Sequence, residues 1–126
     1  MDGTDSSEEN RRKNMVSMDR FNKELRNIVE QLIKTYKPEK IILFGSLNSG
    51  KIWKGTDIDL FIIKSDIPDV GVDRIRELDK LIKYKLSTDF IVYKPEEVEE
   101  RLKIGDPFIK KIFEEGKVIY DAAKNY

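Results

Sequence analysis

The fold of this chain is decided by the stretch Phe44-Gly45-Ser46-Leu47-Asn48-Ser49-Gly50-Lys51-Ile52-Trp53-Lys54-Gly55-Thr56-Asp57-Ile58-Asp59-Leu60. It joins two apolar runs, residues 41–44 and 60–63, which have the composition of buried strands. A glycine-serine turn and a pair of acids therefore lie between two predicted strands.

The two acids of this stretch point to the same side of the second strand. Side chains alternate along a strand, so Asp57 and Asp59 share a face with Cα atoms about 6.5 Å apart. At about 4 Å, two carboxylates repel by roughly 4 kcal/mol at an effective dielectric constant of about 20, and a cation would compensate this cost. Because the chain has no His and no Cys, its oxygen ligands favour Mg²⁺ or Mn²⁺ over zinc.

The glycine-serine turn has the residues of an anion-binding turn. Gly45 allows the backbone to turn tightly after the first strand, and Ser46 is expected to cap a short helix whose free amides face a triphosphate. We therefore expect a phosphate-binding turn and metal-binding acids in one site.

A second motif overlaps this turn. Residues 45–51 also fit the P-loop spacing of a glycine, four residues and Gly-Lys. A P-loop needs Ser or Thr at the next position to hold Mg²⁺, and this chain has Ile52 there. The P-loop stays open as an alternative. A second alternative is an ordinary α/β domain in which the Asp-Ile-Asp sequence occurs by chance and has no function.

The stretch resembles the minimal nucleotidyltransferases of the polymerase β superfamily. Their pattern is an apolar strand, Gly-Ser, a spacer of about ten residues, Asp-x-Asp in a second strand and a third acid on a later strand. In this sequence the spacer runs from Leu47 to Thr56, and Asp89 opens the next apolar run and matches the third acid. Many members carry arginines after Gly-Ser, which this chain lacks. The resemblance spans about residues 18–121 and implies an α/β, polymerase β-like nucleotidyltransferase fold with a small mixed sheet flanked by helices.

The resemblance also implies the chemistry of the site. Asp57, Asp59 and Asp89 would hold Mg²⁺, with two ions expected, and Gly45 and Ser46 would bind the phosphates of ATP. Two ions stabilise the attacking and the leaving oxygen of an in-line displacement. The implied reaction is attack of a hydroxyl on the α-phosphate, with release of pyrophosphate.

A partner must bring the acceptor, because 126 residues make one domain and leave no room for an acceptor-binding domain. Minimal nucleotidyltransferases of this size commonly pair with a small helical HEPN-type toxin and act as its antitoxin by transferring AMP to a tyrosine on it. The resemblance implies this function here. Two alternatives stay open, a subunit that modifies a small hydroxylated molecule and a catalytically silent binding antitoxin. Lys51 and Lys54 of the spacer are expected to be solvated.

Composition limits the other partners and the compartment. Lys+Arg and Asp+Glu are both 24, so zero net charge gives no electrostatic case for binding nucleic acid or an anionic membrane. The apolar runs are shorter than the roughly 20 residues of a membrane span, and the polar N-terminus is not a secretory signal. We therefore expect a cytoplasmic protein, and oligomerisation stays open.

The domain is expected over residues 17–122, between a disordered tail at 1–16 and a short tail at 123–126. Apolar periodicity and turn residues predict helices over residues 18–36, 67–86, 95–103 and 107–115, and strands over 40–44, 57–64, 88–93 and 117–120. Asp106 is the expected N-cap of the last helix, and Gly116 its end. The charged side of the helix over residues 67–86, which includes Arg74, is expected to face solvent.

Overall fold

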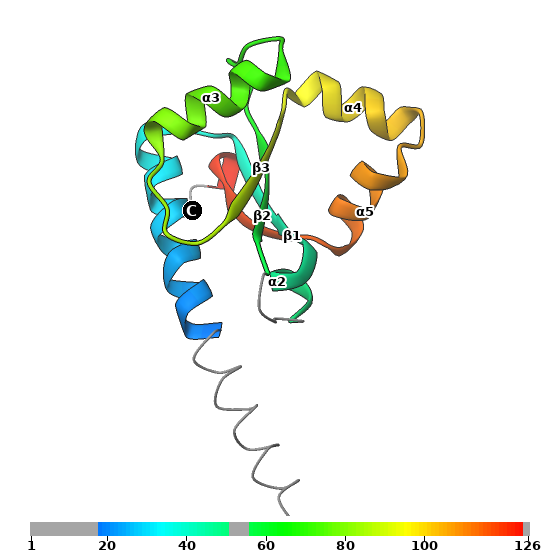
Figure 1. Ribbon diagram of the computed structural model, residues 1–126. Coiled ribbons are helices and arrows are strands. Elements are labelled where there is room, and N and C mark those ends of the chain that lie inside the picture. Colours follow the sequence, from blue (N-terminus) through cyan, green and yellow to red (C-terminus); the bar gives the residue numbers. More distant parts are fainter. Residues whose placement is uncertain (1–17, 51–55, 125–126) are drawn as a thin grey trace, which may run out of the picture.

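The computed structural model describes residues 18–50 and 56–124, and within these ranges a four-stranded mixed sheet forms the centre of the fold (Figure 1). The strands are β1 (Lys40–Phe44), β2 (Ile58–Ile63), β3 (Thr88–Tyr93) and β4 (Lys117–Asp121), in the order β3-β2-β1-β4. β1 is antiparallel to β2 and β4, whereas β2 and β3 are parallel. The predicted mixed sheet is confirmed.

Helices lie on both sides of this sheet. A helix over residues 18–31 continues as the π-helical turn η1 (Leu32–Tyr36). The later helices are α2 (Gly45–Ser49), α3 (Gly71–Leu81), α4 (Pro95–Lys103), α5 (Pro107–Glu115) and the 3-10 turn η2 (Ala122–Lys124). In the described ranges, no helix has both the length and the apolar character needed to cross a membrane.

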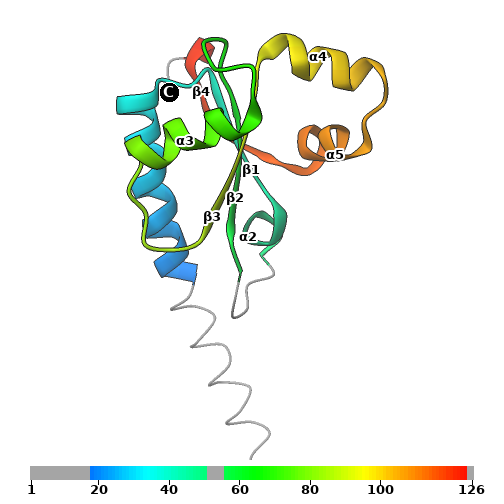
Figure 2. The same cartoon turned by 45° about the horizontal axis from the view of Figure 1, so that its top comes forward.

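The sheet separates two apolar cores. The helix over residues 18–31, η1 and α3 cover one face, and α4 and α5 cover the other (Figures 1 and 2). Ile58, Leu60 and Ile62 of β2 belong to the first core, whereas Phe61 and Ile63 belong to the second. Because side chains alternate along β2, Asp59 lies on the α4 and α5 side.

Local sequence fixes the starts of α4 and α5. Pro95 and Pro107 are the first helical residues, a position that tolerates the missing N–H of proline. The carboxylate of Asp106 accepts hydrogen bonds from the N–H groups of Phe108 (3.0 Å) and Ile109 (3.3 Å). The predicted cap and the predicted bounds of these two helices are confirmed.

Helix α3 is shorter than the predicted helix over residues 67–86. It begins only after Pro68, at Gly71, and at Ile82 the backbone is extended, with φ −108° and ψ 127°. Gln31 holds the next residue, since its side chain donates to the carbonyl of Lys83 (2.7 Å) and accepts from the Lys83 N–H (2.8 Å). A contact between residues 52 positions apart therefore helps to end the helix, and local periodicity carries no information about it.

The predicted tails fall mainly outside the described residues. The tail expected at residues 1–16 lies entirely outside them. In the tail expected at 123–126, Ala123 and Lys124 are described, and both belong to η2. The N–H of Ala123 donates to the carboxylate of Asp121 (3.0 Å), which ties this part of the chain to the end of β4.

Candidate active site

The three predicted acids meet at one end of the sheet. Asp59 of β2 is in register with Asp89 of β3 and with Phe44 of β1. Partners on adjacent strands lie about 4.8 Å apart and present their side chains on the same face. Asp57 directly precedes β2, and its charge acts on Asp59. Topology thus joins acids that are distant in sequence.

These carboxylates repel one another. Burial, followed by the charges of Asp89 and Asp57, raises the pKa of Asp59 to about 6. A hydrogen bond that protonated Asp59 shares with Asp89 adds to this rise. Asp89 is exposed, whereas Asp57 and Asp59 are half-buried, so the group opens to solvent. Carboxyl groups shifted in this way gather at functional sites.

Gly45 brings the turn after β1 against Asp59. Its φ of 77° lies in the left-handed region that favours glycine. A Cβ at this position would lie 2.2 Å from Oδ2 of Asp59, closer than any real contact. The backbone angle therefore favours glycine here, and a side chain at this position would have to displace the carboxylate of Asp59.

Ser46 lies inside the first turn of α2 and does not cap it, so the expected capping role is wrong. The N-cap residue is Phe44, because the helix already begins at Gly45. The P-loop alternative fails for a related reason. A P-loop glycine-lysine pair leads into its helix, whereas Gly50 ends α2 with φ 78°.

A cleft of about 760 Å³ opens beside Gly45, between α2 and α5. Its lining includes Gly45, Ser46, Asn48 and Ser49 from α2 and Phe108, Lys111, Ile112 and Glu115 from α5. Asn48 joins the two helices, since its side-chain amide donates to the carbonyl of Glu115 (2.8 Å). An aromatic wall with a few polar groups is a typical lining for a small-molecule site.

The donor set at the acids suits a hard divalent cation. All the candidate ligands are carboxylate oxygens, as Mg²⁺ prefers, and burial together with the charges of Asp89 and Asp57 raises the pKa of Asp59. Among the residues that the structure describes, no group of three acidic side chains already has the arrangement of a formed metal cage.

The structure brings five predicted site residues into one region. They are Gly45, Ser46, Asp57, Asp59 and Asp89, and they surround the end of β2. The spacer residues Lys51 and Lys54 lie outside the described residues.

The helix over residues 18–31 positions the segment that leads to Asp89. The carboxylate of Glu24, which is 7% exposed, accepts hydrogen bonds from the N–H groups of Lys85 and Leu86 and from the side chain of Asn27. Burial opposes ionisation, but the hydrogen bonds from Leu86 and Lys85 outweigh it and lower the pKa of Glu24. This contact was not predicted from the sequence.

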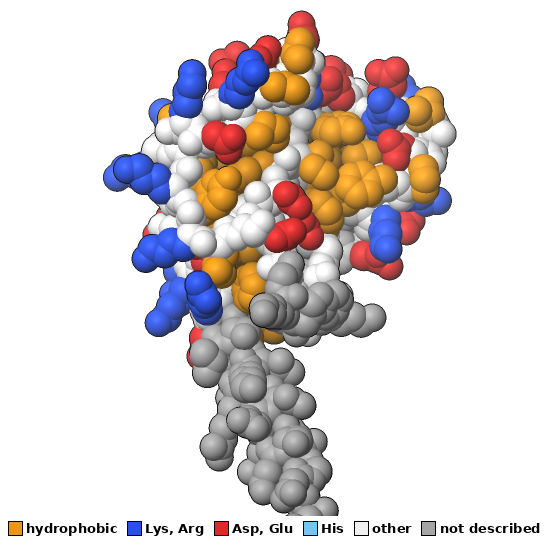
Figure 3. All heavy atoms as spheres, in the orientation of Figure 1, with side chains coloured by type: hydrophobic (Ala, Val, Ile, Leu, Met, Phe, Trp, Pro, Cys, Tyr) orange, Lys and Arg blue, Asp and Glu red, His pale blue; other side chains and the backbone are white. Residues whose placement is uncertain are grey.

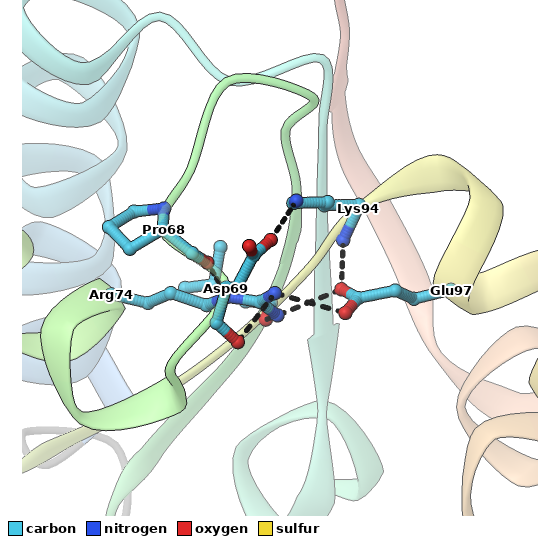
Figure 4. A network of polar contacts seen from close by, with 6 residues as sticks. Pro68, Asp69, Arg74, Lys94 and Glu97 are labelled. Carbon is cyan, nitrogen blue, oxygen red and sulfur yellow. Dashed lines mark hydrogen bonds and ion pairs between the residues drawn. The ribbon is translucent and has the colours of Figure 1, made fainter.

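Arg74 is buried, although the sequence predicted that it faces solvent. Its guanidinium donates to the carbonyls of Pro68 (2.6 Å) and Val92 (3.0 Å) and to both carboxylate oxygens of Glu97 (2.8 and 3.0 Å) (Figure 4). Glu97 also accepts from the N–H of Lys94 (2.8 Å). The network ties together α3, β3 and α4, so Arg74 has a structural role.

Spacing alone carried a signal for both missed residues. Glu24 lies three positions after Phe21 and four before Ile28, within the apolar stripe of its helix. Arg74 lies four positions before the fully buried Leu78, on the same helix face. A charged residue inside an apolar stripe indicates a buried, hydrogen-bonded group.

The chain is similar to known proteins over most of its length. Residues 26–125 match the family described as "Polymerase beta, Nucleotidyltransferase". Two proteins of Methanocaldococcus jannaschii are similar over most of the chain. "Putative protein adenylyltransferase MJ1305" is 30% identical over 82% of this chain and 79% of that protein. "Putative protein adenylyltransferase MJ0604" is 34% identical over 78% of this chain and 96% of that protein.

A solved structure has the same fold. The crystal structure titled as a putative nucleotidyltransferase from Sulfolobus solfataricus superposes with a TM-score of 0.63, at 22% sequence identity, over 90% of this chain and 91% of that one. The fold and the family match both indicate a nucleotidyltransferase. The arrangement of Gly45, Asp57, Asp59 and Asp89 is consistent with this family. The chain belongs to the polymerase β family of nucleotidyltransferases.

Proposed function

We propose that this nucleotidyltransferase transfers AMP from ATP to a hydroxyl of a partner protein in the cytoplasm, with Mg²⁺ held by Asp57, Asp59 and Asp89. The partner is a helical HEPN-type toxin, the acceptor is a tyrosine on it, and the transfer makes this chain an antitoxin. The name protein adenylyltransferase, carried by both archaeal relatives, supports a protein acceptor.

One observation carries the proposal more than any other. Asp59 lies in register with Asp89, close enough to Asp57 for its charge to act, and against the turn at Gly45. Three carboxylates beside a turn with free backbone amides can hold both a divalent cation and the phosphates that the cation accompanies. A purely structural role would not explain why the fold keeps carboxylates that repel.

The surface beside the acids supports a large acceptor. In Figure 3 acidic side chains at the centre of the face are flanked by hydrophobic ones. Phe108 is 48% exposed and Phe113 is 37% exposed, and both lie on α5, which covers the same face of the sheet as Asp59. Exposed aromatic surface next to a reaction site is typical of protein contacts.

Each residue has a distinct task in the proposed reaction. Gly45 leaves room for the carboxylate of Asp59, and the α2 turn at Gly45 and Ser46 faces the phosphates. Asp89, the most exposed of the acids, lies where an incoming hydroxyl would approach. When bound, Mg²⁺ would neutralise charge on the phosphates and on the attacking oxygen. The hydroxyl oxygen bonds to the α-phosphorus, pyrophosphate leaves, and the hydroxyl proton goes to solvent.

The test is transfer of label from α-labelled ATP in the presence of Mg²⁺. The protein is incubated alone, with the product of its neighbouring gene and with a panel of small hydroxylated molecules. Label on a tyrosine of the partner protein supports the proposal. Pyrophosphate release that requires a small acceptor supports the small-molecule alternative, and no turnover with any acceptor supports the silent binding module.

A matched pair of variants assigns the chemistry to the acids. Asp59→Asn keeps the side-chain shape and is expected to reduce transfer at least about 1,000-fold, or roughly 4 kcal/mol of activation free energy. Asp79→Asn, at an exposed position on α3, makes the same chemical change and is expected to leave transfer unchanged. Equal activity of the two variants would remove Asp59 from the site.

A further inference from the structure

The cleft between α2 and α5 adjoins the acids and has a basic residue in its wall. Gly45 both lines this cleft and contacts Asp59, so the cleft and the carboxylates share a boundary. Lys111 of α5 lies across the cleft from α2 and is the one Lys or Arg among the described lining residues. A polyanion that reached the acids from this side would pass Lys111.

The position of Lys111 relative to α2 is fixed by contacts at the end of α5. Asn48 donates to the carbonyl of Glu115 (2.8 Å), which joins the two helices directly. A Cβ on Gly116 would lie 2.4 Å from the carbonyl oxygen of Ile112 and 2.6 Å from Cγ2 of Ile42, so the end of α5 packs closely on β1. These contacts fix the position of α5 relative to α2, so the two sides of the cleft are held in place.

The ammonium group of Lys111 is available for a ligand. It forms an ion pair with Glu115 at 3.9 Å, and the two side chains are 75% and 66% exposed. Exposed pairs of this kind are weak and are easily exchanged for a stronger anion. In the same wall, Phe108 stands edge-on to Phe44, with ring centroids 5.9 Å apart.

We infer that Lys111 binds the polyphosphate of the nucleotide donor in the cleft between α2 and α5. This inference rests on the proposed function, because it assigns the donor of that reaction to one side of the acids. The site has three carboxylates and the donor is itself strongly anionic, so binding needs positive charge beyond the metal. Lys111 supplies this charge from α5, on the far side of the phosphates from α2.

The test measures binding by isothermal titration calorimetry without an acceptor. The probes are tripolyphosphate and ATP, each with Mg²⁺, and the variants are Lys111→Ala, Lys111→Arg and Lys110→Ala. Lys110 is exposed on the same helix and outside the cleft lining, so its removal changes net charge equally. Lys111→Ala is expected to raise both dissociation constants about tenfold, as loss of one charge-assisted contact would. Lys110→Ala is expected to change them less than about twofold, and Lys111→Arg to restore binding.

The outcomes separate this inference from the proposed function. Equal weakening by Lys110→Ala and Lys111→Ala would show a diffuse charge effect and overturn the assignment, as would unchanged binding to Lys111→Ala. If transfer proceeds while Lys111→Ala binds normally, the proposed function stands and the inference falls. If tripolyphosphate binding depends on Lys111 but no acceptor is ever labelled, the inference stands and the transfer reaction falls. Failure of the parent protein to bind either probe would overturn both.

Discussion

Two acidic groups, Asp59 on β2 beside the start of β3 and Glu97 on α4 beyond its end, are in opposite electrostatic situations. Beyond the end of β3, Glu97 accepts two hydrogen bonds from Arg74, and these bonds are the main reason that the pKa of Glu97 is lowered. At the start of β3, burial and the charges of Asp89 and Asp57 raise the pKa of Asp59 to about 6. The carboxylate of Glu97 is paired with the cation of Arg74, whereas the carboxylate of Asp59 lies near two other carboxylates.

This difference distinguishes a structural group from a functional one. Arg74 and Glu97 satisfy each other and also bind backbone groups, so nothing further is needed for their burial (Figure 4). When both are ionised, Asp59 and Asp89 repel, and either a bound cation or protonation of Asp59 relieves this repulsion. Changes at the first site should therefore affect stability, whereas changes at the second should affect chemistry and can even improve stability.

Arg74→Met should destabilise the protein more than the other substitutions considered below. It should lower the free energy of unfolding by about 3 kcal/mol, because it removes the donor to the carbonyl of Val92 and leaves Glu97 with only the N–H of Lys94. This value is at the lower end of the range for buried pairs, since the Glu97 side chain is 36% exposed. Urea unfolding measures the loss, and transfer activity per folded molecule should be unchanged.

Arg76→Met is the matched control for this change. Arg76 is on the same helix, and its ion pair with Asp73 (3.5 Å) is exposed. Its removal should change the free energy of unfolding by less than about 0.5 kcal/mol. Equal destabilisation by the two variants would mean that burial of Arg74 has no special importance.

Gly45→Ala should have the next largest effect and should act at the other end of β3. The positive φ of Gly45 makes alanine unfavourable by about 1–2 kcal/mol, and the new Cβ would also displace the carboxylate of Asp59. Gly105→Ala is the control, because Gly105 has φ 75° but open space around it. Both variants should lose stability, measured by urea unfolding, but only Gly45→Ala should lose transfer activity, by at least about tenfold. Full activity of Gly45→Ala would separate the turn from the acids.

Asp59 and Glu97 should also differ in how they make stability depend on pH. The folded-state pKa of Asp59, about 6, is above its ordinary value of 3.8, so the folded protein binds the proton more tightly. Stability due to this group is therefore lost as pH rises from about 4 to about 6. In EDTA at pH 7, Asp59→Asn should be about 1–2 kcal/mol more stable than the parent, a value reduced for partial exposure, and at pH 4 the two should be equal.

In the presence of Mg²⁺ the parent should become more stable than Asp59→Asn. Ligand binding to the folded state raises stability, so thermal unfolding at pH 7 should shift upward with Mg²⁺ for the parent and much less for Asp59→Asn. The stability contributed by Glu97 should change with pH in the opposite direction to that of Asp59. Its lowered pKa contributes stability that is present above its ordinary value of 4.5 and is lost as pH falls below it. A stability difference between Asp59→Asn and the parent that is the same at pH 4 and pH 7 would contradict the assignment to Asp59.

Sequence predicted the elements whose causes are local. The strands at residues 40–44 and 88–93, the cap at Asp106 and the grouping of Asp57 and Asp59 follow from alternation, turn residues and spacing, and all are present in the structure. The features that it missed depend on contacts between distant residues. The end of α3 depends on Gln31, and Arg74 is paired with Glu97. Spacing along the helix can indicate that Arg74 is buried, but no local pattern identifies either of these distant partners.

Glu24→Gln should have the smallest effect and tests a third kind of acidic group. Glu24 is buried like Asp59 but satisfied by neutral donors, the N–H groups of Lys85 and Leu86 and the side chain of Asn27. Glutamine keeps one acceptor oxygen, so the free energy of unfolding should fall by about 1 kcal/mol at pH 7. Because the pKa of Glu24 is lowered, the difference from the parent should shrink as pH falls below about 4.5.

The control for this last change is Glu30→Gln, at an exposed position on the same helix, which should leave stability within about 0.5 kcal/mol of the parent. Glu24 holds the segment that leads into β3, so its variant should also weaken transfer slightly by loosening the position of Asp89. Amide hydrogen exchange at Lys85 and Leu86 measures this loosening directly. If exchange there is unchanged while transfer falls, Glu24 acts on the site by another route, and the acids at the start of β3 are held by the sheet alone.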